Sequence, residues 1–432
     1  MRLTLLPCAM TVAVVSLFPP AVGAQDVPLS QLLPQLIQSE VRLAPPPPGF
    51  ISHEAHFIPG QNQVLAPILF NQQIVTQLAT FPIGSSSGGF SFTFDPTLGT
   101  FERATQSFGP AFAERALTNG KGKLTFGVNT QYSNYSSFEG QNLDNGDVKF
   151  YLRHEDNGGL FFEGDLVEAA LSLDLSSSTT TAFANYGVTD RFDVAVAVPI
   201  VRVSMNARVN AAVLPLATPN IPGIHVFPNG QKTSSLASSG SASGLGDILV
   251  RSKYRFLDAA GGGLAAGVDI RLPTGDDDNL LGTGATAVTG TLIGSTTIGR
   301  IAPHFNVGFT KSSSGDIVDA PDEFGYRFGA EFVASPKITL ATTFIGRTLI
   351  DAGRLELTRT SWDFRNNLGV PGNTSFDEYG LRSGSLNLAT LAMGTKINVV
   401  GNVLLSANLL VALSSAGVTA RVTPVFGIDY SF

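Results

Sequence analysis

From Lys121 to its last residue, the sequence alternates apolar and polar side chains with a period of two. The first segment of this kind places Leu124, Phe126, Val128 and Tyr132 on one face and small polar residues on the other. The pattern returns at residues 192–198, 248–256, 268–272, 326–332 and 402–411. Successive side chains of a β-strand point to opposite faces, so this period predicts strands with one apolar and one polar face.

A one-sided soluble sheet would show the same alternation, but two further features favour strands in lipid. The strands are long, about 10 residues or more, as a tilted strand needs to cross a bilayer. Short connections at 188–191, 335–337 and 400–402 also alternate with long polar ones at 210–243, 275–284, 312–323 and 351–382. We therefore predict an all-β, transmembrane, antiparallel up-and-down β-barrel over 121–432. Both chain ends should lie on the periplasmic side, which requires an even number of strands. The count is about 12 if 165–188 is one strand, and 14 if that segment splits or an early hairpin joins.

The composition agrees with a membrane barrel and limits the partners. Charged residues make up 14% of the chain, against about 25% in typical soluble domains, and glycine is abundant at 46 residues. Past the N-terminal segment, no apolar run approaches the roughly 18 residues of a membrane helix. A secreted β-solenoid or sandwich is the other class with such a composition. A net charge of −7 argues against a nucleic-acid partner.

Residues 1–24 have the order of a secretory signal peptide. Arg2 is followed by an apolar stretch from Ala9 to Phe18 and by small residues that end at Ala24, the expected cleavage point. The apolar run is too short for a membrane anchor, which needs roughly 20 residues. Cys8, the only cysteine, falls in the removed part. The mature chain is therefore expected to lack disulfides and thiol chemistry.

Residues 25–120 do not follow the barrel pattern. An amphipathic stretch from Leu29 to Ile37 predicts a short helix, and Pro45 to Pro48 form a stiff spacer. Phe90, Phe92 and Phe94 alternate with polar residues before a turn at Asp95-Pro96, which predicts a hairpin. The sequence leaves two placements open for this part: a plug inside the barrel, or a periplasmic extension.

The last strand ends in an alternating aromatic pattern. Val422, Phe426, Ile428, Tyr430 and Phe432 point one way, and Phe432 is the final residue. As the edge of a soluble sheet, this strand would invite aggregation. Ile428, Tyr430 and Phe432 instead resemble the signal that the outer-membrane assembly machinery reads, which makes that machinery and outer-membrane lipid the expected partners.

Three segments, in this order, carry a resemblance to a known family. They are Tyr186 to Asp193 (Tyr-Gly-Val-Thr-Asp-Arg-Phe-Asp), Gly244 to Ile248 running on to Lys253-Tyr254-Arg255-Phe256, and Leu272-Pro273-Thr274-Gly275-Asp276. They resemble the outer-membrane family named for the meta-pathway of phenol degradation, a relative of the long-chain fatty-acid and aromatic-hydrocarbon channels. The resemblance covers roughly 121–432. It implies a monomeric barrel that admits small hydrophobic or aromatic molecules. The chain lacks the Asn-Pro-Ala tripeptide that opens the plug of the fatty-acid channels, which puts their lateral-diffusion route in doubt here.

If the apolar faces meet lipid, the polar faces line the lumen. The candidate lumen-lining residues are Asp247, Arg251, Lys253, Arg255, Asp269, Arg271, His304, Arg327 and Glu331. Arg251, Lys253 and Arg255 form a basic ladder along one strand, which would steer anionic or phenolic solutes. The favoured alternative is a neutralised network in which Asp247, Asp269 and Glu331 pair with this ladder and fill the barrel, because ions away from bulk water need partners.

Other polar clusters favour structural interpretations. Asp276-Asp277-Asp278 lacks the spaced ligands of a calcium loop, so a solvated loop tip is favoured over a calcium site. His53 and His56 have no third ligand at metal-binding spacing. His304 has no Gly-x-Ser-x-Gly nucleophile elbow beside it, so a barrel hydrolase ranks last. We expect no metal, no cofactor and no enzymatic activity.

The sequence thus predicts an outer-membrane channel that passively admits small hydrophobic or aromatic solutes, with residues 25–120 obstructing or gating its lumen. The alternative is a structural or surface-interaction barrel that acts through its long loops at 210–243 and 351–382.

Overall fold

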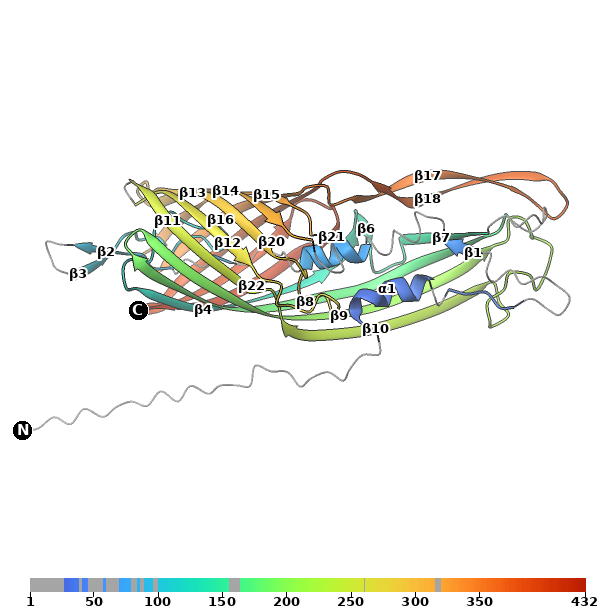
Figure 1. The fold of residues 1–432 in the computed structure, drawn as a ribbon, viewed down its shortest axis with the longest axis horizontal. Coiled ribbons are helices and arrows are strands. Elements are labelled where there is room, and N and C mark those ends of the chain that lie inside the picture. Colours follow the sequence, from blue (N-terminus) through green and yellow to red (C-terminus); the bar gives the residue numbers. More distant parts are fainter. Residues whose placement is uncertain are drawn as a thin grey trace, which may run out of the picture.

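The computed structural model describes residues 27–38, 41–45, 57–59, 70–78, 84–85, 89–95, 100–154, 164–259, 261–314 and 320–432. Its main body is a closed antiparallel barrel of twelve strands (Figure 1). The strands are β4 (Leu124–Tyr135), β8 (Leu166–Thr189), β9 (Phe192–Leu214), β11 (Leu249–Ala259), β12 (Gly262–Arg271), β13 (Ala287–Ser295), β14 (Ile301–Ser312), β15 (Glu323–Ser335), β16 (Ile338–Leu349), β19 (Leu386–Val400), β20 (Val403–Ala412) and β22 (Val422–Ser431). The ring closes because β8 pairs with β4 on one edge and with β9 on the other. The predicted fold class and strand number are confirmed, and the segment at 165–188 is one strand.

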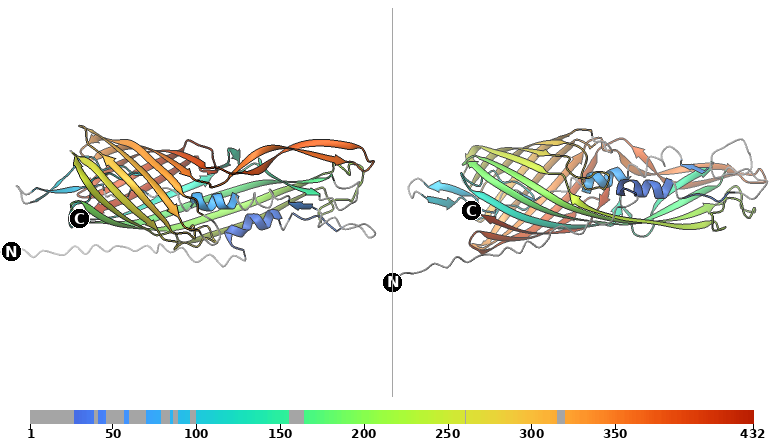
Figure 2. Two further views of the ribbon diagram at one scale, coloured as in Figure 1. Left: turned by 45° about the horizontal axis from the view of Figure 1, so that its top comes forward. Right: turned by 60° about the horizontal axis from the view of Figure 1, so that its bottom comes forward.

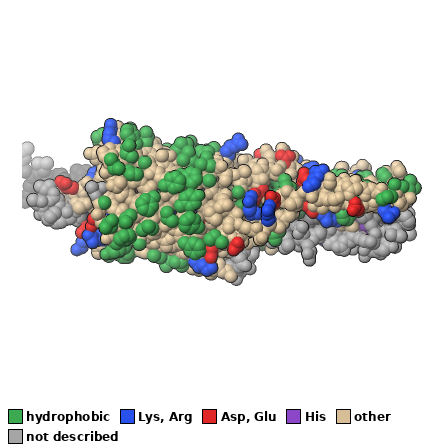
Figure 3. Space-filling model, turned by 90° about the horizontal axis from the view of Figure 1, so that it is seen from above, with side chains coloured by type: hydrophobic (Ala, Val, Ile, Leu, Met, Phe, Trp, Pro, Cys, Tyr) green, Lys and Arg blue, Asp and Glu red, His purple; other side chains and the backbone are tan. Residues whose placement is uncertain are grey.

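The alternation of each strand places its apolar face outside. Phe126 and Phe328 are 48% and 51% exposed, whereas Thr125, the neighbour of Phe126, is 1% exposed. Hydrophobic side chains cover the barrel surface as a broad band in Figure 3, and charged side chains gather beyond it. Such an outer face is stable against lipid and costly in water, so the fold is that of a transmembrane β-barrel.

The two ends of the barrel differ, and we name them by their connections. At the turn end, β8–β9, β15–β16 and β19–β20 are joined by the predicted tight turns, and Phe432 ends the chain there. Gly261 has φ +65° in the β11–β12 connection at this end, a left-handed conformation that glycine adopts without a steric penalty. At the loop end the connections are longer, as the alternation of short and long connections predicts.

The loop end carries a large extension that the sequence did not predict. β8 and β9 have 24 and 23 residues, about twice the length of most other barrel strands, and their far halves continue beyond the barrel. Added to them are β10 (Thr233–Leu245) on β9, β7 (Val148–His154) on β8, and β1 (Phe57–Pro59) on β7. A small separate sheet forms from β21 (Val418–Thr419), β5 (Ser137–Phe138) and β6 (Gln141–Asn142), in which β5 pairs with both of the others.

Two of the long loops were therefore predicted over too many residues, because strands occupy part of each range. Only 215–232 connects strands within 210–243, because 233–245 pairs along β9 as β10. The segment 351–382 folds into a hairpin of β17 (Arg354–Arg365) and β18 (Pro371–Arg382), which reaches along the extension. Their high content of small and polar residues concealed strands whose backbone is satisfied by pairing outside the membrane.

The extension has a hydrophobic core of its own. Helix α1 (Leu29–Gln38) forms at the predicted amphipathic stretch, and a second helical segment spans 70–78. Both lie against the inner face of the extended sheet (Figure 2). Leu33, Ile74, Leu173 and Met205 are fully buried in this one cluster. Burying such side chains contributes about 1.5–3 kcal/mol each. No helix in these described segments is both long and apolar enough to cross a bilayer.

The N-terminal part of the chain also enters the barrel. Residues 84–85 and 104–120 lie in the lumen, where Phe108, Phe112 and Leu117 are buried. The predicted hairpin forms as β2 (Phe92–Asp95) and β3 (Thr100–Arg103), projects from the turn end, and stays outside the barrel ring. The structure thus places described parts of 25–120 in the lumen and at both ends of the barrel. The expected signal peptide at 1–24, Pro46 to Pro48, His53 and His56 lie outside the described residues.

Candidate functional site: a lumenal chamber

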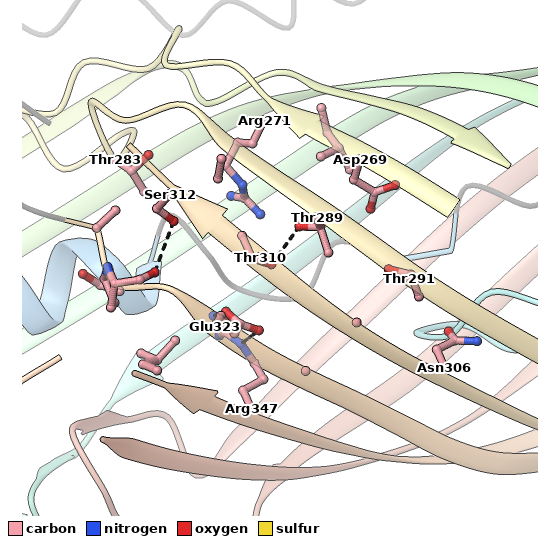
Figure 4. A pocket seen from close by; sticks show the side chains of 18 of the residues that line it. Asp269, Arg271, Thr283, Thr289, Thr291, Asn306, Thr310, Ser312, Glu323 and Arg347 are labelled. Atoms are coloured by element: carbon pink, nitrogen blue, oxygen red, sulfur yellow. Dashed lines mark hydrogen bonds and ion pairs between the residues drawn. The ribbon is translucent and has the colours of Figure 1, made fainter. Parts of the chain in front are cut away.

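A cavity of about 120 Å³ lies inside the barrel toward its loop end (Figure 4). The inward faces of β11 to β16 form most of its wall, and Thr76 of the helical segment 70–78 also reaches it. Four arginines and two acidic residues line this chamber: Arg251, Arg271, Arg327, Arg347, Asp269 and Glu323. Arginine therefore exceeds acid by two in the lining.

Two of the four arginines are held by carboxylates on the next strand. Arg251 donates from Nε and Nη2 to the two oxygens of Asp269, at 2.7 and 2.6 Å. Arg347 makes the same two-pronged contact with Glu323, at 2.9 and 2.6 Å. Bidentate pairs of this kind fix the geometry of both partners. The bidentate hydrogen bonds of Asp269 and Glu323 thus go to Arg251 and Arg347 and not to the other two arginines.

Arg327 differs from these two. It lies opposite Asn306 in the β14–β15 register, so both side chains point to the inside of the barrel. It makes no hydrogen bond or ion pair with any residue that the structure describes, although it lines the cavity. Figure 4 shows Arg271 pointing into the chamber. Unlike Arg327, Arg271 interacts with other residues of the protein.

The rest of the lining mixes hydroxyl and aliphatic groups. Thr289 and Thr310 share a hydrogen bond of 2.8 Å across β13 and β14, and Thr291 lies two residues along. Leu249 and Leu349 supply aliphatic surface and are themselves buried. The chamber can therefore contact an apolar group and a polar or charged group of one small molecule.

The N-terminal segment closes the chamber on the side of the turn end. Asn306, a lining residue, accepts a hydrogen bond from the backbone N–H of Glu114 at 2.7 Å and donates one to its carbonyl at 2.8 Å. The Glu114 carboxylate accepts from Arg251 at 2.6 Å and from Ser85 at 3.1 Å. The wall of the chamber thus holds Glu114 by both backbone and side chain.

Further buried cations hold the same segment below the chamber. Lys253 donates to the carbonyls of Arg115 and Leu117, at 3.2 and 2.9 Å. Lys396, on the opposite wall, donates to the carbonyls of Phe108 and Pro110, at 3.2 and 3.0 Å. Small apolar clusters add to these polar contacts, because Phe112 packs with Ile345 and Leu410 of the wall and Phe108 packs with Leu404. We refer to residues 104–120 as the plug.

On the other side, the chamber adjoins an open hollow of about 580 Å³ at the loop end. The two share Ser312, Ala320 and Pro321 as lining residues. Asp322 stands at this mouth and accepts from Lys311 Nζ at 2.7 Å and from the N–H of Ser312 at 3.1 Å. These two hydrogen bonds, the lysine bond first, hold the pKa of Asp322 below its ordinary value.

His304 belongs to a buried chain of hydrogen bonds and not to the chamber. Its Nδ1 lies 2.7 Å from Glu331, and its Nε2 lies 3.1 Å from the Thr343 hydroxyl. Glu331 also accepts from Ser107 of the plug at 2.7 Å. The imidazole is fully buried, and its two nitrogens face Glu331 and Thr343, so this arrangement ties the plug to the wall.

The remaining predicted lumen residues spread along the barrel. Asp247 accepts hydrogen bonds from Gly275 and Thr283 and so organises the β12–β13 loop. Arg255 lies at the turn end, where it donates to the carbonyl of Asp190 and pairs with Asp258. Within the expected neutralised network, Asp269 pairs with the ladder through Arg251, whose second partner is Glu114 of the plug. Asp247 attracts the neighbouring Arg271, and Glu331 pairs with His304.

The acidic loop tip has local roles in the structure. Asp276 accepts from the backbone and side chain of Asn279, and the carbonyl of Asp278 accepts from the N–H of Ser30. Partial burial raises the pKa of Asp277. No group of three or more His, Cys, Asp or Glu side chains that could hold a metal ion occurs among the residues that the structure describes.

Sequence reasoning missed several residues of the site. Arg347 and Glu323 follow the period of two on their strands, so the alternation could have predicted both as lumen-lining residues. Glu114 gives no such signal, because the plug has no regular secondary structure and its partners are 137 and 192 residues away.

A closed twelve-stranded ring, a lipid-facing apolar band and a polar lumen define the class of this protein as a transmembrane β-barrel with an internal plug. The family described as "Putative MetA-pathway of phenol degradation" matches residues 162–353. This range contains all three motif segments, and the resemblance stated from them is confirmed over it.

The solved structures to which this chain is similar include outer-membrane channels. One from Pseudomonas putida F1 is 14% identical, covers 73% of this chain and 98% of its own, and has a TM-score of 0.43. The toluene transporter TbuX of Ralstonia pickettii is 13% identical, with 82% and 99% covered and a TM-score of 0.32. These scores are too low to support an argument about function. No curated protein matches the sequence.

Proposed function

We propose that this protein is an outer-membrane channel that passively admits small solutes, aromatic ones among them, and that its N-terminal plug closes the lumen. The observation behind this proposal is the chamber, which adjoins an open mouth on one side and is closed on the other by a segment held through polar contacts and small apolar clusters. The family match supports the aromatic part of the proposal. We further propose that residues 1–24 direct export and are removed, and that the barrel works as a monomer in outer-membrane lipid.

Single-channel conductance in a planar bilayer tests the proposal, with the intact mature chain compared with a variant that lacks residues 25–118. We expect the intact chain to be nearly silent, because the plug fills the lumen, and the shortened chain to conduct steadily. The twelve barrel strands begin at Leu124, so the hydrogen-bonded ring is complete in both proteins. A large, steady conductance from the intact chain would contradict closure by the plug.

A second function is favoured by the extension at the loop end. The β17–β18 hairpin and the sheet around β10 present a large structured surface beyond the lipid-facing band. If both the intact and the shortened chain are silent, a surface-interaction barrel that acts through this extension becomes the better proposal.

A further inference from the structure

We propose that the lumenal chamber is a binding site for a small organic carboxylate, with Arg327 as its counter-ion. The inference rests on the proposed channel function, since such a carboxylate would be a solute that the channel admits. It names a chemical class for that solute that neither the family description nor the similar structures supply.

The charge of the chamber is the first reason. Of its four arginines, Arg251 and Arg347 are each neutralised by a bidentate carboxylate. Glu114 is a second partner of Arg251, and the charge of Asp247 attracts Arg271. Arg327 is therefore left without a hydrogen-bonded carboxylate among the described residues, and an anion would supply that partner where a neutral hydrocarbon would not.

The position of Arg327 is the second reason. Its cross-strand neighbours are Asn306 on β14, which the plug occupies, and Ile345 on β16, which is buried. The acids whose charges attract it, Glu323 and Asp269, each accept two hydrogen bonds from other arginines. A guanidinium without a hydrogen-bond partner among the described residues, placed on a cavity, presents its donors to whatever enters. The planar fork of arginine matches a carboxylate with two parallel hydrogen bonds.

The volume and the lining of the chamber limit the size and the chemistry of the rest of the ligand. The volume of about 120 Å³ is comparable in scale to the roughly 150 Å³ of an engineered cavity that holds benzene. Leu249 and Leu349 offer apolar contact for one ring, and the Thr291 hydroxyl offers a polar one. We therefore expect a monocyclic aromatic carboxylate to fit better than a neutral ring of the same shape or an inorganic anion.

Isothermal titration calorimetry on the intact mature protein in a non-ionic detergent tests this inference. The probes are benzoate, its neutral isostere benzamide, and inorganic phosphate. We expect benzoate to bind at least about tenfold more tightly than either of the others, a factor that corresponds to about 1.4 kcal/mol. Equal binding of benzamide would overturn the assignment of a charge-selective site. Equal or tighter binding of phosphate would overturn the organic class.

Three variants locate the binding. Arg327→Gln should weaken benzoate binding at least about tenfold, and Arg327→Lys should weaken it less, because the charge stays and the fork is lost. Lys337→Gln is the matched control, since it removes an exposed cation from the turn end of the same pair of strands. Thermal unfolding followed by circular dichroism checks that each variant is folded. Unchanged binding in a folded Arg327→Gln protein would overturn the proposal.

These experiments can overturn the binding proposal and the channel proposal independently of each other. Titration needs no transport, and conductance of the shortened chain needs no ligand. If the shortened chain conducts but benzoate does not bind, the carboxylate site is overturned and the channel stands. If benzoate binds through Arg327 but no form conducts, the site stands and the channel function fails.

Discussion

Glu114 is the residue on which the closed state of the lumen most depends. Its carboxylate accepts hydrogen bonds from Arg251 and Ser85, and its backbone bonds to Asn306, so one residue links the plug to β11 and β14 of the barrel. It is 5% exposed, which removes the competition of water for these bonds.

We expect Glu114→Ala to loosen the plug. Arg251 keeps Asp269, so the variant should still fold, but the lost charged hydrogen bonds contribute about 1.5–3 kcal/mol to holding the plug in place. Planar-bilayer recordings should then show frequent openings that the unmodified chain lacks. Glu356→Ala, which removes an exposed acid from the β17–β18 hairpin, is the control and should stay silent. Recordings of Glu114→Ala as silent as those of the control would show that other contacts suffice to keep the plug closed.

Asp322 predicts a pH effect at the mouth. Its folded-state pKa lies below the ordinary value, so its ionised form stabilises the fold. That contribution is complete above the unfolded pKa, about 4 for aspartate, and is lost as the pH falls through the lower folded value. The difference in unfolding midpoint between the parent and Asp322→Asn should therefore be constant from pH 7 to 5 and shrink at lower pH. A difference that grows on acidification would contradict this sign.

At the scale of elements, β22 closes the ring and carries the proposed assembly signal. It pairs with β20 on one side and β4 on the other, and the N–H of Phe432, the residue that follows it, donates to the carbonyl of Leu124. The Phe432 ring is 55% exposed and meets Phe126 and Tyr430 edge-on, with centroids 6.0 and 4.6 Å apart. These contacts hold the C-terminal end of the chain against the barrel wall.

Deleting Phe432 should lower the yield of assembled barrel several-fold. The aromatic terminus is what the assembly machinery is proposed to read, while the ring of strands is otherwise complete. The measurement is the fraction of folded protein in outer-membrane preparations. Phe332→Ala removes another exposed aromatic near the turn end and is the matched control. Equal losses in both would point to the aromatic surface in general and not to a terminal signal.

At the scale of the whole molecule, the arrangement of ends predicts an orientation in the membrane. The tight turns and Phe432 share one end, and the extension forms the other. In outer-membrane barrels the short turns face the periplasm and the long connections face outward. The extension, with the chamber mouth beside it, should therefore face the outside of the cell.

Single cysteines test this orientation, because the mature chain is expected to have none. Leu368→Cys, at the 74% exposed tip of the β17–β18 connection, should react with a membrane-impermeant maleimide on intact cells. Lys337→Cys, exposed in a tight turn, should react only after the outer membrane is breached. The opposite pattern of labelling would reverse the proposed orientation.

The alternation of side chains predicted the barrel, its apolar band and a count of about 12 strands, because a period of two is a local property of each strand and a sheet in lipid has to close. The structure decided between 12 and 14 by forming one strand at 165–188. The sequence also indicated which side chains point inward. Tertiary structure alone decided which of them meet. Arg251 pairs with Asp269 because β11 and β12 are neighbours in register, but its second partner, Glu114, comes from an irregular segment with no period to read. Whether an arginine is neutralised or left facing a cavity depends on such distant contacts, and so the chamber at Arg327 became visible only in the folded barrel.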